Sequence, residues 1–189
     1  MSELIATTSR LVIRKIEDGD QDLVYNISRE FPALESFQED CEFLKLYREV
    51  CWNETNSPNI YNGMIFLKDS GIFVGKICMQ NIDHAVPELG IDIMKAHQNC
   101  GYGPEAIIAF CNWYSATYKT YEIKVRIREE NTHSIHVFEK LGAKYDKATS
   151  YFSKDVLDVI KRQLPDADLS VLSQNSVKDY LLQLPFYIS

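Results

Sequence analysis

The chain has 189 residues, of which 46% are hydrophobic and 25% charged, and its formal net charge is -7 at pH 7. These values are typical of one globular domain with a substantial core, and they exclude a disordered chain. The acidic balance argues against nucleic-acid binding through a broad basic face, whereas it favours an amine or another cationic substrate.

Cysteine usage and targeting signals bear on the compartment. The five cysteines are odd in number and form no C-x-x-C pair, so we expect neither a disulfide framework nor a zinc knuckle. The stretch MSELIATTSR lacks the basic and apolar regions of a secretory signal, and no segment approaches the roughly 18 apolar residues of a membrane helix. We therefore expect a soluble, cytoplasmic protein with no membrane partner.

The first part of the chain predicts one strand and two helices. RLVIRKI (10–16) alternates apolar and polar side chains, as a half-buried strand does. The sequence DGD (18–20) breaks this pattern and is suited to start a helix that runs to about Glu30. Apolar residues then recur at near-helical spacing and predict a second helix over about 34–52.

Three strand-like runs follow in quick succession, at 60–68, 71–81 and 88–94. Asp69-Ser70-Gly71 joins the first two runs as a hairpin turn would, and a short polar stretch separates the third. These runs predict an antiparallel meander.

The next segment alternates between helix and strand. A glycine turn precedes a helix whose first position is expected to be Pro104, where a missing N–H costs nothing. EIKVRIRE (122–129) alternates strongly and predicts a strand. A short helix should follow, with Asn131 as its N-cap and Gly142 as its C-terminal stop.

The end of the chain predicts one further strand, at 143–153, and then a helical tail. We therefore expect an α+β (mixed α/β) domain over 1–153, with helices on a central, mostly antiparallel sheet, and a helical extension over 154–189 packed on it. The extension has three open roles, namely covering the sheet, shaping a cleft, or forming a homodimer contact. The dimer contact would use Leu181, Leu182, Leu184 and Phe186.

The glycine turn QNCGYGPEA (98–106) is the clearest candidate site. Backbone N–H groups that converge at a helix start, together with the helix dipole, favour a phosphate or pyrophosphate. A P-loop is excluded because no lysine or hydroxyl follows the last glycine, and a dinucleotide fingerprint would have Ala106 as its third small residue but belongs to a parallel βαβ unit. A glycine turn without any ligand stays the alternative.

Two motifs together resemble the acetyl-CoA signature of the GNAT N-acetyltransferases, particularly the branch related to ribosomal-protein N-terminal acetyltransferases. The turn matches the pattern [QR]-x-x-G-x-[GA], and a second motif, N-x-x-S followed by E-K-x-G, lies about 25 residues further on. The matching residues are Gln98, Gly101 and Gly103 in the first motif, and Asn131, Ser134, Glu139, Lys140 and Gly142 in the second.

The resemblance implies that acetyl-CoA is the co-substrate and assigns residues to hold it. The strand before the turn would pair with the pantetheine arm, the turn would hold the pyrophosphate, and Asn131 would reach the pantetheine. The implied cofactor-binding residues are Ile91, Ile93, Met94, Gln98, Asn99, Cys100, Gly101, Tyr102, Gly103, Pro104 and Asn131. Within the turn, Cys100 is expected to be a small buried spacer, and Tyr102 to pack at the helix edge.

Acetyl transfer to an amine needs a base, a stabilised oxyanion and a leaving thiolate. Glu88 is the first candidate for general base, directly or through water, against the alternative of a solvated residue after Pro87. Many family members place a tyrosine before the E-K pair as thiolate donor, but this chain has Phe138 there. Ser134 is the leading substitute, against the alternative of a first-turn hydroxyl that bonds the backbone.

The acceptor side and the metal question rest on fewer residues. Plausible lining residues for an ammonium group are Phe31, Glu35, Tyr145 and Tyr151. His133 and His136 share a helix face, but no nearby carboxylate or cysteine completes a set of ligands, so no metal is expected. The leading function is N-acetyl transfer to a primary amine, on a protein N-terminus or a small molecule, and the alternative is a non-catalytic CoA-binding sensor or structural protein.

Overall fold

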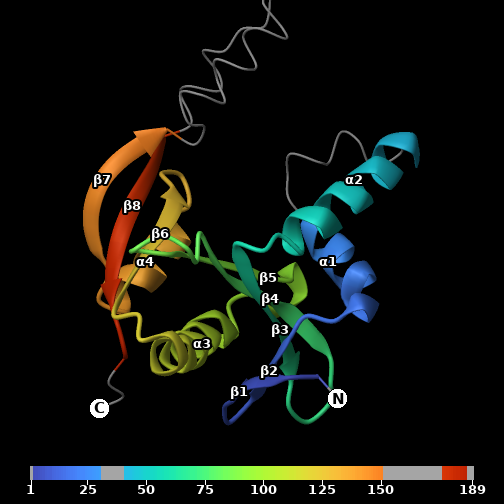
Figure 1. The fold of residues 1–189 in the computed structure, drawn as a ribbon, viewed down its shortest axis with the longest axis horizontal. Helices are drawn as coiled ribbons and strands as arrows, with labels where there is room; N and C mark the ends of the chain where they lie inside the picture. The colour runs from blue at the N-terminus through green and yellow to red at the C-terminus, as the bar shows by residue number, and fades with distance from the viewer. Residues whose placement is uncertain (1, 31–40, 151–175, 187–189) are drawn as a thin grey trace, which may run out of the picture. The chain divides into compact units, whose positions relative to one another are not determined.

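The computed structural model describes residues 2–30, 41–150 and 176–186, which fall into two compact units (Figure 1). One unit comprises Met1–Tyr121 and Leu184–Ser189, and the other comprises Glu122–Gln183. The two units therefore meet near residue 121 of the chain. The predicted domain end at 153 lies outside the described residues and stays a prediction.

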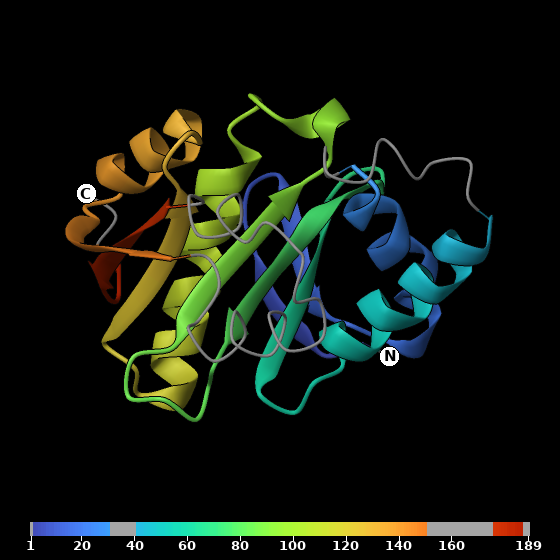
Figure 2. The same cartoon turned by 90° about the horizontal axis from the view of Figure 1, so that it is seen from above.

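The first unit is built on five strands that pair in chain order, each antiparallel to the next. Figure 2 shows the last three side by side, which confirms the predicted meander. The short first strand is not among the predicted elements, because four residues are too few to show a period. The strands are β1 (Leu4–Thr7), β2 (Leu11–Lys15), β3 (Ile60–Leu67), β4 (Phe73–Gln80) and β5 (Glu88–Ile93).

Helices cover both faces of this sheet (Figure 1). Neighbouring residues of β3 show the two sides, because successive side chains of a strand point to opposite faces. Asn62 donates to the carbonyl oxygen of Thr55 at 2.6 Å, whereas the ring of Tyr61 packs 5.1 Å from that of Trp113. The helices are α1 (Gln21–Ser28) and α2 (Cys41–Thr55) on the first side and α3 (Tyr102–Tyr118) on the second, with 3-10 turns at Asp18–Asp20 and Lys95–His97.

The core lies between the sheet and α3. Ile13, Ile65 and Ile77 lie on the strand face that also carries Tyr61, and each is fully buried. Phe110 and Ile107 of α3 are equally buried. Each such side chain contributes about 1.5–3 kcal/mol of hydrophobic stabilisation, so β5 and the start of α3, which flank the glycine turn, are attached to a rigid scaffold.

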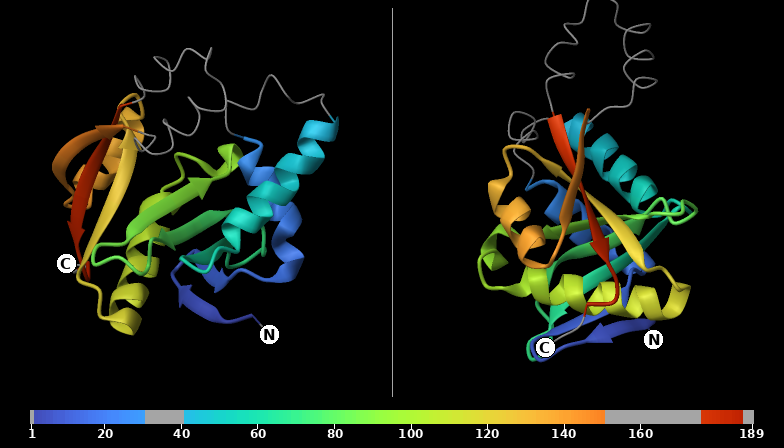
Figure 3. Two further views of the ribbon diagram at one scale, coloured as in Figure 1. Left: turned by 45° about the horizontal axis from the view of Figure 1, so that its top comes forward. Right: turned by 90° about the vertical axis from the view of Figure 1, so that its left-hand side faces the viewer.

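The second unit contains three antiparallel strands and one helix. Figure 3 shows the last strand (red) between the other two (yellow and orange). The predicted strand at 122–129 and the predicted helix after Asn131 are both present. The elements are β6 (Glu122–Arg128), α4 (Thr132–Lys140), β7 (Lys144–Ser150) and β8 (Ser176–Gln183).

The predicted helical tail is wrong over Ser176–Gln183, which forms strand β8. A short apolar run fits the periods of both a helix and a strand, so its partners decide. Here β6 and β7 hydrogen-bond to β8 on its two sides. Leu182 and Leu184, which the sequence offers for a dimer contact, are buried within the chain.

None of the described helices is both long and apolar enough to cross a membrane.

Candidate functional site

The glycine turn lies between β5 and α3, and two left-handed residues shape it. A 3-10 turn at Lys95–His97 follows β5, and Gln98 then folds back so that its Nε2 donates to the carbonyl oxygen of Ile93 at 2.9 Å. Asn99 has φ 60° and Gly101 has φ 77°. These values bend the backbone sharply into α3, which begins at Tyr102.

The turn leaves a set of backbone donors open. Gln98, Asn99, Cys100 and Gly101 are all exposed. In the described part of the chain, the N–H groups of Asn99, Cys100 and Gly101 have no acceptor, and no side chain caps α3. The first N–H groups of any helix also lack intrahelical acceptors. Unpaired donors at a helix start fit the pyrophosphate of CoA, as the resemblance implies.

The two glycines of the turn differ in what they require. Gly101 has a positive φ, and a Cβ there would also meet Nη2 of Arg10 at 3.3 Å. Gly103 has no positive φ, and a Cβ there would meet only Cγ1 of Ile93, at 3.9 Å. On backbone grounds, glycine is therefore required at position 101 and not at position 103. Pro104 is the third residue of α3 and not its first.

Strand β5 is paired with β4 along its whole length. Two backbone groups near its end are already engaged, because Met94 N–H donates to Val74 at 2.9 Å and the carbonyl of Ile93 accepts from Gln98. Ile91, Ile93 and Met94 are each half-buried. A pantetheine arm would therefore have to use the other backbone groups of this strand.

Glu88 begins β5, directly opposite Gln80 of β4. It is half-buried and follows the buried Pro87. Strand alternation places it on the face away from Leu89, which is buried. Glu88 is therefore held on a paired strand, on the side of α1 and α2.

Asp92 lies on the same face of β5, two alternations beyond Glu88, and directly opposite Lys76. Burial raises the pKa of Asp92, and the charge of Lys76 partly opposes this rise. Asp92 is not among the site residues predicted from the sequence, although strand alternation from Glu88 identifies it. Glu88 and Asp92 therefore share one face of β5.

Asn131 and Ser134 of the second unit form a helix start of a different kind. Oδ1 of Asn131 accepts the N–H of Ser134 at 3.1 Å, which confirms the predicted N-cap. Ser134 is half-buried, and no partner for its hydroxyl is present among the described residues. Phe138, at the position of the tyrosine common in relatives, is 4% exposed. Gly142 ends the helix with φ 90°, as predicted.

The predicted acceptor residues are only partly within the described structure. Tyr145 of β7 is 57% exposed and packs edge-on against Tyr180, with ring centroids 5.9 Å apart. Phe31, Glu35 and Tyr151 lie outside the described residues. The predicted lining role of these three residues therefore stays a prediction.

Residues 10–144 match the family model of the acetyltransferase (GNAT) domain, which is well over half of the chain. The chain belongs to the GNAT acetyltransferase family. Comparison with curated proteins gave no significant match.

Solved structures of other GNAT proteins share the fold. A spermidine N-acetyltransferase from Vibrio cholerae in complex with CoA and spermine superposes with a TM-score of 0.70 at 16% identity, covering 96% of this chain and 100% of that one. The spermidine/spermine N-acetyltransferase SpeG from the same organism, in complex with manganese ions, gives 0.65 at 17% identity and covers 93% of each chain. The predicted mixed α+β GNAT fold is confirmed, and the protein is an acetyl-CoA-dependent N-acetyltransferase.

The buried cysteines Cys78 and Cys111 are not activated as thiolates in this GNAT protein. Burial raises the pKa of both Cys78 and Cys111, so both remain thiols at neutral pH. Cys100 is exposed, so its predicted role as a buried spacer is wrong, because the turn bulges into solvent. Direct attack by the acceptor amine needs none of these thiols.

Residues 2–30, 41–150 and 176–186 contain no group of three His, Cys, Asp or Glu side chains that is arranged to hold a metal ion. His133 and His136 are both exposed on α4.

Two charged residues that connect the turn to the rest of this GNAT domain, Arg10 and Glu105, are not among the residues predicted from the sequence. Arg10, just before β2, contacts both the turn and Glu105 in the first turn of α3. No local pattern marks this pair, because 95 residues separate its members.

Proposed function

We propose that this enzyme transfers the acetyl group of acetyl-CoA to a primary amine by direct attack within a ternary complex. The observation that supports this most is the uncapped start of α3, where the exposed N–H groups of Asn99 to Gly101 lack acceptors in the described structure. Such donors bind a pyrophosphate without any metal ligand from the protein. The second GNAT motif of the sequence adds independent support.

Each proposed step belongs to a named group. Acetyl-CoA supplies the thioester carbon that the amine nitrogen attacks, and the carbon–sulfur bond breaks to release the thiolate. Glu88 takes a proton from the acceptor ammonium, directly or through water, so that the neutral amine can attack; its half-buried carboxylate is fixed on a paired strand. Asn131 at the pantetheine and Ser134 at the thiolate keep the roles that the family resemblance and the sequence predict.

The acceptor is proposed to be a small polyamine-like cation in preference to a protein N-terminus. The net charge of -7 and the carboxylates of Glu88 and Asp92 on one face of β5 favour a cation. The similar Vibrio cholerae structure with bound spermine points the same way. Kinship with the ribosomal-protein N-terminal acetyltransferases stays a prediction, and a peptide panel would reveal it.

Two measurements test this proposal. Calorimetry with acetyl-CoA, NADH and ATP should show binding of acetyl-CoA alone, and lack of acetyl-CoA binding would end the proposal. Thiol release should then be followed with spermidine, other amines and peptides. Binding without thiol release from any acceptor would favour the non-catalytic CoA-binding protein, for which Phe138 is the best argument.

Glu88→Gln tests the base directly. The substitution should lower kcat at least about 100-fold, as loss of a general base typically does, and should leave acetyl-CoA binding intact. Asp83→Asn is the matched control, since it removes one negative charge from the exposed loop before β5. Unchanged turnover in Glu88→Gln would show that another group takes the proton.

A further inference from the structure

We propose that Arg10 is a positioning residue that orients the pyrophosphate-binding turn through the carbonyl of Cys100. This inference rests on the proposed function, because it requires the turn to hold the pyrophosphate of CoA. It adds a residue outside both family motifs, which begin at Gln98 and Asn131.

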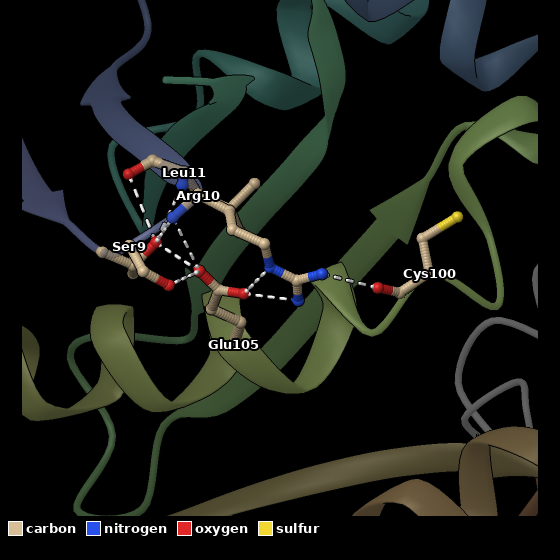
Figure 4. A network of polar contacts seen from close by, with 6 residues as sticks. Ser9, Arg10, Leu11, Cys100 and Glu105 are labelled. Atoms are coloured by element: carbon tan, nitrogen blue, oxygen red, sulfur yellow. Dashed lines mark hydrogen bonds and ion pairs between the residues drawn. The ribbon is translucent and has the colours of Figure 1, made fainter. Parts of the chain in front are cut away.

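Arg10 contacts the turn and the helix at the same time (Figure 4). Its Nη1 donates to the carbonyl oxygen of Cys100 at 3.0 Å. Its Nε and Nη2 reach Oε2 of Glu105 at 2.7 and 2.6 Å. The guanidinium carbon also lies 4.7 Å from the ring centroid of Tyr102. The planar five-donor group of arginine can make these contacts together, whereas a lysine ammonium cannot.

The contact with Cys100 controls the direction of the next N–H. The peptide bond between Cys100 and Gly101 is planar, and in a trans peptide the C=O and N–H point in opposite directions. With its carbonyl held by Arg10, this peptide turns the N–H of Gly101 to the opposite side. That N–H has no acceptor among the described residues, so it is available to a ligand phosphate. Release of the carbonyl would let the peptide rotate and misdirect the donor.

Glu105 fixes the arginine but also places a negative charge in the first turn of α3. Its other oxygen, Oε1, accepts from the hydroxyl of Thr8 and from Arg10 N–H at 3.2 Å. Burial opposes ionisation, but these hydrogen bonds and the arginine charge outweigh it and lower the pKa of Glu105. An ionised, unpaired carboxylate here would repel a pyrophosphate, so the Arg10 charge also neutralises the turn.

Stability and affinity should respond differently to loss of this contact. The Arg10 side chain is 47% exposed, and ion pairs between exposed side chains contribute little to folding. The contact should therefore matter more to the shape of the turn than to the stability of the fold. A comparison with a second arginine of the same hairpin separates these effects. Arg14 makes a more buried bidentate pair with Asp20, at 2.7 and 2.6 Å.

The test measures CoA affinity by calorimetry and Tm for wild type, Arg10→Gln and Arg14→Gln. Arg10→Gln should weaken CoA binding about tenfold, the loss expected for one charge-assisted contact, with little change in Tm. Arg14→Gln should lower Tm and leave the CoA affinity unchanged. Equal CoA affinity in Arg10→Gln and wild type overturns the positioning role, whereas lack of CoA binding in wild type overturns the proposed function itself.

Two ligand fragments distinguish positioning of the turn from direct contact with the 3′-phosphate of CoA. Dephospho-CoA lacks the 3′-phosphate, and acetyl-pantetheine lacks the pyrophosphate as well. Arg10→Gln should weaken the binding of dephospho-CoA as much as that of CoA, and it should leave the KM for acetyl-pantetheine unchanged. A loss confined to CoA would mean that Arg10 binds the 3′-phosphate directly, and would overturn the proposal. Arg10→Lys retains the charge and guards against misfolding; it should bind CoA several-fold more weakly, and wild-type affinity would count against the proposal.

Discussion

Helices α3 and α4 differ in what their first N–H groups, which lack intrahelical acceptors, bind. The N-cap residue of α4 is Asn131, whose own side chain accepts the N–H of Ser134. The N-cap residue of α3 is Gly101, which has no side chain, and no other side chain caps this helix. In a capped helix, the side chain of the cap accepts one of the first N–H groups, so that donor is not available to a ligand. In an uncapped helix, all of the first N–H groups can bind a ligand.

The difference shows which helix start is suited to an anion. The first turn of α4 has no acidic residue, while that of α3 contains Glu105, whose charge is balanced by Arg10 from a distant segment. Helix α3 therefore depends on a tertiary contact to balance the charge in its first turn, whereas α4 needs no such contact. Four variants, each of which changes one residue at the start of α3 or α4, should show this difference. Gly101→Val should have the largest effect and Asn99→Gly the smallest.

Gly101→Val should have the largest effect. A valine at φ 77° is strained by about 1–3 kcal/mol, and its Cβ would press on Arg10, which lies 3.3 Å from that position. We expect CoA affinity to fall at least about 100-fold, since turn geometry and access are both lost. Calorimetry and thermal unfolding measure the two parts. Gly103→Ala is the control for stability, and a comparable fall in its Tm would contradict the distinction between the glycines.

Asn131→Ala should destabilise α4 by about 1 kcal/mol, the typical cost of a lost N-cap. This corresponds to about 2–4 °C in Tm for a chain of this size. Asn131→Asp retains the capping oxygen but loses the amide donor, so its Tm should match wild type. If the predicted contact with pantetheine exists, Asn131→Asp still raises the KM for acetyl-CoA; an unchanged KM would leave the residue as a cap alone.

Glu105→Gln should have a smaller effect on stability, and one that depends on pH. The folded-state pKa of Glu105 is lowered from its ordinary value of 4.5, so its ionised form stabilises the fold above that pH, and this contribution is lost as pH falls through the folded pKa. The Tm difference between Glu105→Gln and wild type should therefore be largest near neutrality and vanish in acid. The Tm difference between Asn131→Ala and wild type should stay constant over the same pH range. If the Tm differences of both variants declined together in acid, the proposed contrast between the two helix starts would be refuted.

Asn99→Gly should change least. Asn99 has φ 60°, a conformation that glycine adopts without cost, but glycine also increases the entropy of the unfolded chain. These effects oppose each other, so we expect a change within about 0.5 kcal/mol and no change in CoA affinity. A large gain in stability would show that the positive φ strains the backbone at Asn99, in addition to requiring glycine at position 101.

Local patterns predicted much of the fold because their causes are local. The alternation of 122–129, the cap at Asn131 and the stop at Gly142 involve neighbouring residues, and all three are confirmed. Strand β8 was missed because its short apolar run fits two periods, and only pairing with β6 and β7 decides between them. The exposure of Cys100 was missed for a related reason, since the bulge of a turn does not follow from its residue types.

By itself, the sequence determined that a glycine turn with an anion-binding character precedes α3 and that a capped helix follows β6, because glycine, asparagine and strand alternation act over a few residues. Only the tertiary structure decided which glycine of the turn must stay a glycine. It also decided that Arg10 holds the carbonyl of Cys100 across 90 residues of chain. Side-chain pairs so far apart leave no periodic trace, and they exist only once the sheet has brought their strands and helices together.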